Sequence, residues 1–249
     1  MHSYEQEISL ELQTWQKRML KSPSIMDGLS KKIQDKMNTL IPEKVHKGIT
    51  IAIKQMVRAV LFGSMHTSAQ NVENIGIEET EKKVQERIRF YRTAAAAEGG
   101  ATGAGGFLLS VADFPILLAL KLKMLFDIAS LYGYDVNDYK ERLYILHIFQ
   151  LAFSSQGHKR DVYLQMEHWD LQQTKLPDDV NAFDWRRFQQ EYRDYIDLAK
   201  LAQLVPGIGA VVGVVVNYRL VRRLGITAMN AYRMRKLKPH QIANSFNGR

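Results

Sequence analysis

The stretch Ala94–Met124 reads "AAAAEGGATGAGGFLLSVADFPILLALKLKM" and decides how the chain folds. It holds five glycines, one aspartate and one proline in an otherwise apolar run. A segment of this kind can be a phosphate-binding loop, a membrane span or a closely packed part of a core. The residues around the glycines separate these three interpretations.

The glycines do not match a phosphate-binding loop. The P-loop closes with a lysine and a hydroxyl residue, and the dinucleotide fingerprint Gly-x-Gly-x-x-Gly follows a strand. Here a helix-favouring alanine run precedes the glycines, and the apolar residues Phe107, Leu108 and Leu109 follow them. The sequence therefore argues against nucleotide binding at this segment.

Small residues instead recur every four positions. Ala95, Gly99 and Gly103 fall on one row of a helix surface, and such a row lets another helix approach closely. In a second apolar segment, Val205–Val216, Gly209 and Gly213 repeat the pattern. We therefore predict two Gly-rich apolar helical hairpins packed centrally. Their packing glycines are Gly99, Gly103, Gly105, Gly106, Gly207, Gly209 and Gly213.

Neither segment is a convincing membrane span. Phe107–Phe126 would form about 30 Å of helix, which is long enough, but Asp113 near its middle would cost about 2.5–3.5 kcal/mol to insert. Val205–Val216 would form only about 18 Å. Two interpretations remain, namely hairpins buried in the core and hairpins that dip into a bilayer or a membrane partner.

The rest of the chain carries helical signals. Ser3 and Gln6 form a capping box for a helix to about Lys21, and Asp113 before Pro115 fits the start of another helix. Gly133 is placed to end that helix. Further helices are predicted over 25–40, 42–60, 77–92, 139–153 and 185–204. Asn137 or Asp138 should cap the helix over 139–153, and Asp184 should cap the helix over 185–204. Residues 154–183 should form a surface helix followed by a loop.

These signals predict an all-α, compact multi-helix bundle. We expect one domain over 1–249, with an N-terminal helix at 1–22 and a frayed tail at 239–249. The first twenty residues lack the apolar core of a signal peptide, and the chain has no cysteine. We therefore expect a cytoplasmic protein.

The net charge of +8 is concentrated near the C-terminus, because all 26 acidic residues precede residue 198. Clusters of Lys and Arg beside an apolar segment are attracted to anionic lipid by about 1 kcal/mol per charge. No zinc finger or other nucleic-acid-binding motif accompanies the charge, so we expect an anionic membrane surface and no nucleic acid. The predicted surface contacts are Arg219, Arg222, Arg223, Arg233, Arg235, Lys236 and Lys238.

Catalytic patterns are scarce. Glu167, His168 and Asp170 do not converge on a helix, and we predict no catalytic residue, no metal site and no cofactor. Asp113 and Asn217 occupy equivalent positions in the two Gly-rich segments. They are the predicted buried polar residues, and they leave open an alternative: a helical enzyme, or a small-ligand or lipid binder, with its site between the hairpins.

Three stretches resemble the EcsC family: Ile41–Gly63, Glu98–Asp135 and Leu204–Leu237. Within them the resemblance lies in the Gly-rich run before Asp113-Phe-Pro115, in Tyr132-Gly133, and in Pro206, Gly209-Ala210 and Asn217.

The family is named for a protein encoded beside the subunits of an ABC transporter in Gram-positive bacteria, and its biochemical role is unassigned. The resemblance therefore implies no catalytic residue. It implies an accessory role close to the membrane. Together with the charge pattern, it leads us to expect a non-enzymatic protein at the cytoplasmic face of the membrane, with the membrane surface, ABC transporter subunits or both as partners. The oligomeric state does not follow from the sequence.

Overall fold

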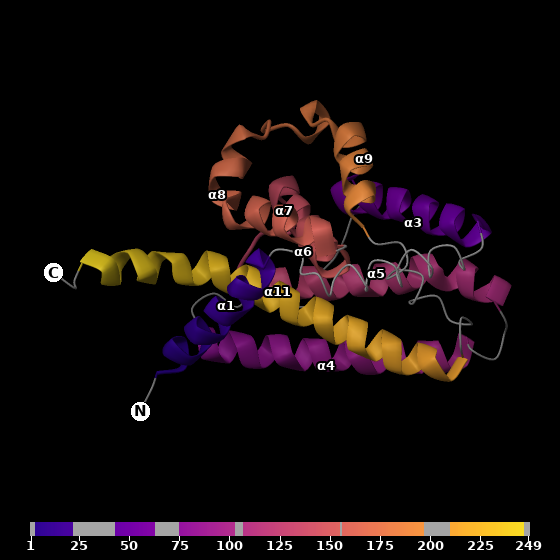
Figure 1. Cartoon of the computed structure of the whole chain (residues 1–249), viewed down its shortest axis with the longest axis horizontal. Helices are drawn as coiled ribbons and strands as arrows, with labels where there is room; N and C mark the ends of the chain where they lie inside the picture. The colour runs from indigo at the N-terminus through magenta and orange to yellow at the C-terminus, as the bar shows by residue number, and fades with distance from the viewer. Residues whose placement is uncertain are drawn as a thin grey trace.

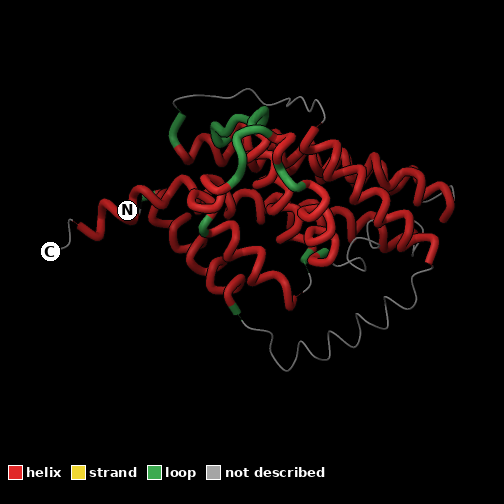
Figure 2. Tube along the Cα trace, turned by 90° about the horizontal axis from the view of Figure 1, so that it is seen from above, coloured by secondary structure: helices red, strands yellow, loops and turns green. Residues whose placement is uncertain are grey.

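The computed structural model describes residues 3–21, 43–62, 75–102, 107–154, 156–196 and 210–246. Helices make up nearly all of this part, and the described loops and turns lie between some of them (Figure 2). Extended pairing within the described ranges is limited to an isolated bridge between Ser154 and Ile196. The predicted all-α bundle is confirmed.

The helices have the following bounds, and their labels are those of Figure 1. They are α1 (Tyr4–Leu20), α3 (Glu43–Phe62), α4 (Ile77–Thr102), α5 (Phe107–Leu131), α6 (Tyr139–Phe153), α7 (Gln156–Glu167), α8 (Trp169–Gln172), α9 (Trp185–Tyr195) and α11 (Ala210–Phe246), with 3-10 turns at Gln173–Lys175 and Val180–Ala182.

The long helices α4, α5 and α11 form the framework of the bundle (Figure 1). Helix α11 packs mainly along α4, and α5 packs on both of them. The N-terminal helix α1 contacts α11, α4 and α7, so it lies where the framework meets the α6–α7 side of the bundle. The last turns of α11 project beyond the other helices (Figure 1).

Four helix boundaries follow from local chemistry. The Ser3 hydroxyl accepts a hydrogen bond from the Gln6 amide, and the Gln6 side chain accepts one from the Ser3 amide. The carboxylates of Asp138 and Asp184 cap α6 and α9. Gly133 has a φ of 81° just after α5, a conformation that favours glycine. These four predictions are confirmed.

The predicted helix start at Asp113 is wrong. Helix α5 begins at Phe107 and continues through Pro115. A break at Asp113 would leave several N–H and C=O groups of two helix ends without partners in an apolar stretch. Proline inside the helix removes one hydrogen bond, so the continuous helix keeps more of its backbone paired.

Helix α11 joins segments that the sequence treats separately. Its 37 residues include the second apolar segment from Ala210 onward and both basic clusters. It also continues through Pro239 to Phe246, where the sequence predicts a frayed tail. The two basic clusters therefore share one helix axis.

The Gly-rich hairpins are described only in part. Helix α4 includes Gly99, α11 includes Gly213, and the packed pair α4 and α5 flanks residues 103–106. The contacts of Gly99 and Gly213 are outside the described part of the structure, so central packing by these glycines stays a prediction. The predicted helix 25–40 lies outside the described residues. The same holds for five predicted packing glycines, namely Gly103, Gly105, Gly106, Gly207 and Gly209.

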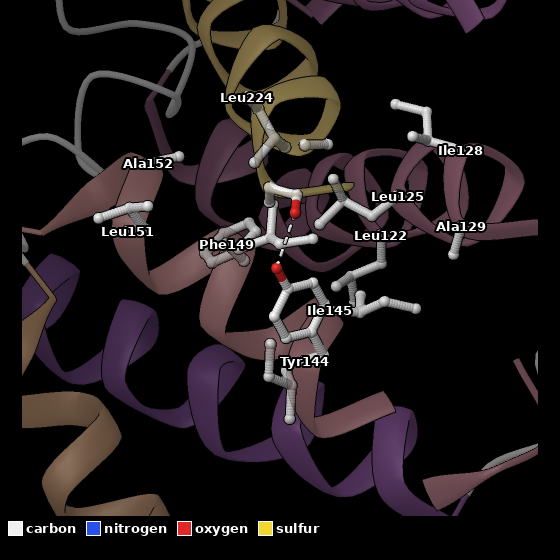
Figure 3. Close-up of a cluster of buried hydrophobic side chains, with 14 of the residues drawn as sticks. Leu122, Leu125, Ile128, Ala129, Tyr144, Ile145, Phe149, Leu151, Ala152 and Leu224 are labelled. Carbon is white, nitrogen blue, oxygen red and sulfur yellow. Dashed lines mark hydrogen bonds between the residues drawn. The ribbon is translucent and has the colours of Figure 1, made fainter. Parts of the chain in front are cut away.

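The core lies where α5, α6 and α11 meet. Leu122 and Leu125 of α5 face Phe149 of α6 and Leu224 of α11 (Figure 3). The buried Tyr144 hydroxyl donates to the Ala231 carbonyl at 2.9 Å, which satisfies a polar group inside the cluster. Among the helices that the structure describes, none combines the length and apolar content needed to cross a bilayer.

Candidate functional site

Three arginines near the middle of α11 face solvent. Arg219, Arg222 and Arg223 are all exposed. Their spacing of three and four residues places them on one side of a helix. The structure thus puts three of the predicted anion-contact residues together on one surface.

Two further cations from other helices join these arginines. Arg18 comes from the last turn of α1, and Lys159 comes from α7. Together the cations line a cavity of about 270 Å³. We call this cavity the basic groove, and it is defined by Arg18, Lys159, Arg219, Arg222 and Arg223.

Apolar side chains form the rest of the basic groove. Trp15 and Met19 of α1, Leu151 of α6 and Ile226 of α11 belong to its lining, and the described lining contains no carboxylate. The indole ring of Trp15 also packs edge-on against the ring of Tyr163 in α7, with 5.8 Å between centroids. This contact fixes α1 against α7 beside the groove.

A larger cavity of about 790 Å³ adjoins the basic groove. Trp15, Arg18, Arg222 and Ile226 line both cavities, so the two share a wall. The larger cavity lies between α1, α4 and α11, and its charged lining mixes arginines with two glutamates. We call it the mixed groove, and its charged residues are Glu7, Glu11, Arg18, Arg89, Arg92, Arg222 and Arg233.

Arg92 of the mixed groove is held by an aromatic ring. Its guanidinium lies 3.9 Å from the ring centroid of Tyr218. Its buried Nε finds no hydrogen-bond partner in the part of the chain that the structure describes. The ring contact therefore positions this guanidinium at the α4 side of the mixed groove.

Arg233, also predicted to contact an anionic surface, lies inside the protein. Its side chain is 6% exposed, and two of its nitrogens bond Glu81 at 2.6 and 2.7 Å. A third nitrogen bonds Glu11 of α1 at 2.8 Å. Burial acts to lower the pKa of Arg233, but hydrogen bonds and charge from Glu81 outweigh burial and raise the pKa overall. Its charge is therefore neutralised inside the protein.

Glu81 is the centre of this ion-pair network. It is fully buried, and it accepts hydrogen bonds from the hydroxyls of Tyr4 at 2.6 Å and Tyr132 at 3.1 Å. Burial, and then the charge of Glu81, raise the pKa of Tyr132 well above its usual value, so this hydroxyl stays a donor. The network joins α1, α4, α11 and the end of α5.

Arg235 makes a second internal pair. It bonds Glu141 of α6 at 2.6 Å and lies 3.8 Å from the ring centroid of Tyr134. Burial raises the pKa of Glu141, and the charge of Arg235 opposes this rise. Lys236 is exposed near the same ring, and the side chain of Lys238 lies outside the described part. The predicted cations thus divide into an exposed group and an internally paired group.

The alternative site between the Gly-rich hairpins stays a prediction. Asp113 belongs to α5 and Asn217 to α11, but their side chains are outside the described part of the structure. The carboxylate of Glu167 accepts a hydrogen bond from the hydroxyl of Tyr163 at 2.6 Å. Within the described residues, no group of His, Asp and Glu side chains could hold a metal ion.

Sequence reasoning missed the partners of these arginines, although one signal was present. Glu81 lies on the same helical stripe as Ile77, Val84 and Ile88, which are on the buried side of α4. A lone carboxylate on an apolar stripe indicates a buried partner. Nothing in the sequence indicates that this partner is Arg233, 152 residues away.

Comparison with known proteins identifies the family of this chain. The model of the EcsC protein family matches residues 6–237, which include all five cations of the basic groove. The chain belongs to the EcsC protein family. It is 43% identical over 225 residues to Protein EcsC of Bacillus subtilis (strain 168), covering 90% of this chain and 92% of that protein.

A second relative matches a shorter part of the chain. The uncharacterized protein YdbA of the same bacterium is 35% identical over 144 residues, covering 58% of this chain and 53% of that protein. No solved structure matches.

Proposed function

We propose that this EcsC-family protein associates peripherally with the anionic, cytoplasmic face of a membrane, as a non-enzymatic accessory to an ABC transporter. The observation that carries the proposal is the convergence of five cations from α1, α7 and α11 at the basic groove. Each Lys or Arg close to an anionic leaflet contributes about 1 kcal/mol of attraction. Five such charges on one surface suffice for reversible membrane binding.

Apolar side chains beside the groove support this orientation. Leu10 of α1 is 67% exposed and Ile226 of α11 is 39% exposed, and both line the mixed groove. Cations with neighbouring exposed apolar groups suit the interface between headgroups and acyl chains. We therefore propose that α1 and the middle of α11 face the bilayer, at the depth of the headgroups.

The transporter part of the proposal rests on the family resemblance. The family's name comes from a protein encoded beside an ABC transporter, and the basic groove would place this chain at the same membrane. Pull-down of purified transporter subunits with and without lipid tests this part separately.

Vesicle flotation tests the membrane part. We expect the purified protein to float with vesicles of phosphatidylglycerol and phosphatidylcholine and to remain behind with phosphatidylcholine alone. The double variant Arg219→Glu/Arg222→Glu should lose flotation. The control Arg58→Glu/Arg186→Glu has the same net charge but changes exposed residues of α3 and α9.

The control variant should float like the unchanged protein. Equal loss in both variants would show that net charge alone governs binding, and it would overturn the assignment to this face. Failure of the unchanged protein to float at low salt would overturn the lipid part of the proposal.

A further inference from the structure

We propose that the basic groove is a binding site for a phosphate group carried by a small headgroup-sized molecule. This inference rests on the proposed function and deepens it, since it names the chemical group that the same arginines hold. The shared chemistry is a phosphate ester, which a lipid headgroup or a soluble metabolite can supply.

The first argument is the origin of the charges. Arg18, Lys159 and the α11 arginines come from three helices that are far apart in the sequence. Arg18, Arg219 and Arg222 carry like charges that repel one another at this cavity, and an anion between them reduces that repulsion. A solvated run of charges on one helix would not require two other helices to contribute.

The second argument is the kind of cation. Four of the five are arginines, whose planar guanidinium presents paired N–H donors that match two phosphate oxygens. The fifth, Lys159, adds a compact point charge. Trp15, Leu151 and Ile226 give the groove an apolar wall, against which a short carbon group attached to the phosphate can pack.

The third argument is size. The basic groove of about 270 Å³ lies just below the range of about 300–1,000 Å³ for sites of drug-sized ligands. It therefore suits a phosphate with a short attached group. The adjoining mixed groove offers Leu10, Ile226 and Met229 to a longer apolar remainder.

Nuclear magnetic resonance of the three tryptophan indoles tests the site directly. Trp15 lines the groove, whereas Trp169 is buried and Trp185 lies on α9, so the latter two serve as internal references. Loss of one peak in Trp15→Phe assigns the resonance. We expect sodium phosphate to shift the Trp15 indole peak, and sodium chloride of equal ionic strength to leave it in place.

Variants locate the effect. Arg18→Gln/Arg222→Gln should weaken the apparent phosphate affinity at least tenfold, and the control Arg58→Gln should leave it unchanged. Both changed positions of the first variant are exposed, and an unaltered melting temperature confirms that it folds. An equal shift with chloride, or a phosphate shift that survives in Arg18→Gln/Arg222→Gln, would overturn the site.

Two soluble probes distinguish the sources of the phosphate. Dihexanoyl phosphatidylglycerol below its micelle concentration should shift Trp15 if the site takes a lipid headgroup. A shift with inorganic phosphate alone supports the site but assigns it to a soluble compound. Vesicle flotation without any phosphate shift overturns the site and leaves the proposed function standing. A shift of the Trp15 peak with phosphate but no flotation supports the site and overturns the proposed membrane association.

Discussion

Gly225 sets the distance between α11 and α4. A Cβ built at this position would lie 2.6 Å from Cγ1 of Ile88, which is 5% exposed. Alanine at a helix interior gains about 1 kcal/mol of intrinsic propensity over glycine, but overpacking a core costs about 1–3 kcal/mol. Because the clash involves atoms near the Ile88 backbone, we expect overpacking to prevail.

Gly225→Ala should therefore lower the free energy of unfolding by up to about 2 kcal/mol in urea denaturation. Combined with Ile88→Ala, its cost should be smaller, because the side chain that blocks the new methyl is gone. Gly76→Ala is the control, since a Cβ there meets nothing within 4 Å. Equal effects of Gly225→Ala in both backgrounds would rule out the contact as the cause.

His147 is held in its neutral form. Its ring packs edge-on against Trp169 and Phe188, and its Nδ1 hydrogen-bonds the side-chain oxygen of Gln150. The Gln150 amide nitrogen donates to the Tyr192 carbonyl, so the oxygen faces the histidine and Nδ1 carries the proton. Burial lowers the pKa of His147 from 6.5 to about 4.

This lowered pKa makes stability depend on pH. His147 binds a proton near pH 6.5 in the unfolded chain and only near pH 4 in the folded protein. The stability that neutral His147 contributes is therefore complete above pH 6.5 and declines as the pH falls toward 4. At pH 5 the loss is about 2 kcal/mol. In urea denaturation at pH 7 and pH 5, the His147→Asn variant should lose less unfolding free energy between the two pH values than the unchanged protein. An equal loss in both proteins would contradict the assignment to His147.

At the scale of helices, local sequence signals were sufficient to predict several helix ends but insufficient to predict the contacts between helices. Ser3, Asp138 and Asp184 cap helices with their own side chains, and Gly133 ends one through its own backbone, so each could be predicted from a few neighbours. Pro115 shows the limit, because a helix continues through it when breaking would leave more backbone groups unpaired.

The site shows the same limit more strongly. The sequence shows Arg219, Arg222 and Arg223 close together on one segment, but Arg18 and Lys159 reach them only through the packing of α1 on α11 and of α7 on α1. Net charge and spacing along one helix carry no information about such convergence.

The arginines of α11 therefore fall into two groups, one paired inside the protein and one exposed to solvent, and substitutions distinguish the two groups. Arg233→Met should lower the free energy of unfolding by about 3–5 kcal/mol, because it leaves Glu81 charged and fully buried without its main partner. Arg219→Met, the same change at an exposed position of α11, should cost less than about 0.5 kcal/mol.

Urea denaturation of both variants measures the difference. Adding Glu81→Gln to Arg233→Met should recover part of the loss, since the unpaired charge is then removed. Similar costs at positions 233 and 219 would show that the buried pair contributes no more than an exposed charge.

For the whole molecule, the exposed charges should respond strongly to salt and the internally paired charges only weakly. The Debye length falls from about 10 Å at 0.1 M to about 3 Å at 1 M, and this screens exposed charges far more than buried ones. The arginines at the basic groove face solvent, whereas the Glu81–Arg233 pair is 0% and 6% exposed.

Sodium chloride at 1 M should therefore release the protein from phosphatidylglycerol vesicles while its melting temperature changes by no more than a few degrees. Flotation and thermal denaturation of the same sample measure both responses. Release that occurs only together with unfolding would mean that salt acts on the fold. Retention at 1 M salt, with release by detergent alone, would mean that apolar segments enter the bilayer and that the arginines contribute little. Release by salt without unfolding places the affinity in the exposed charges, because these are the charges that salt can reach.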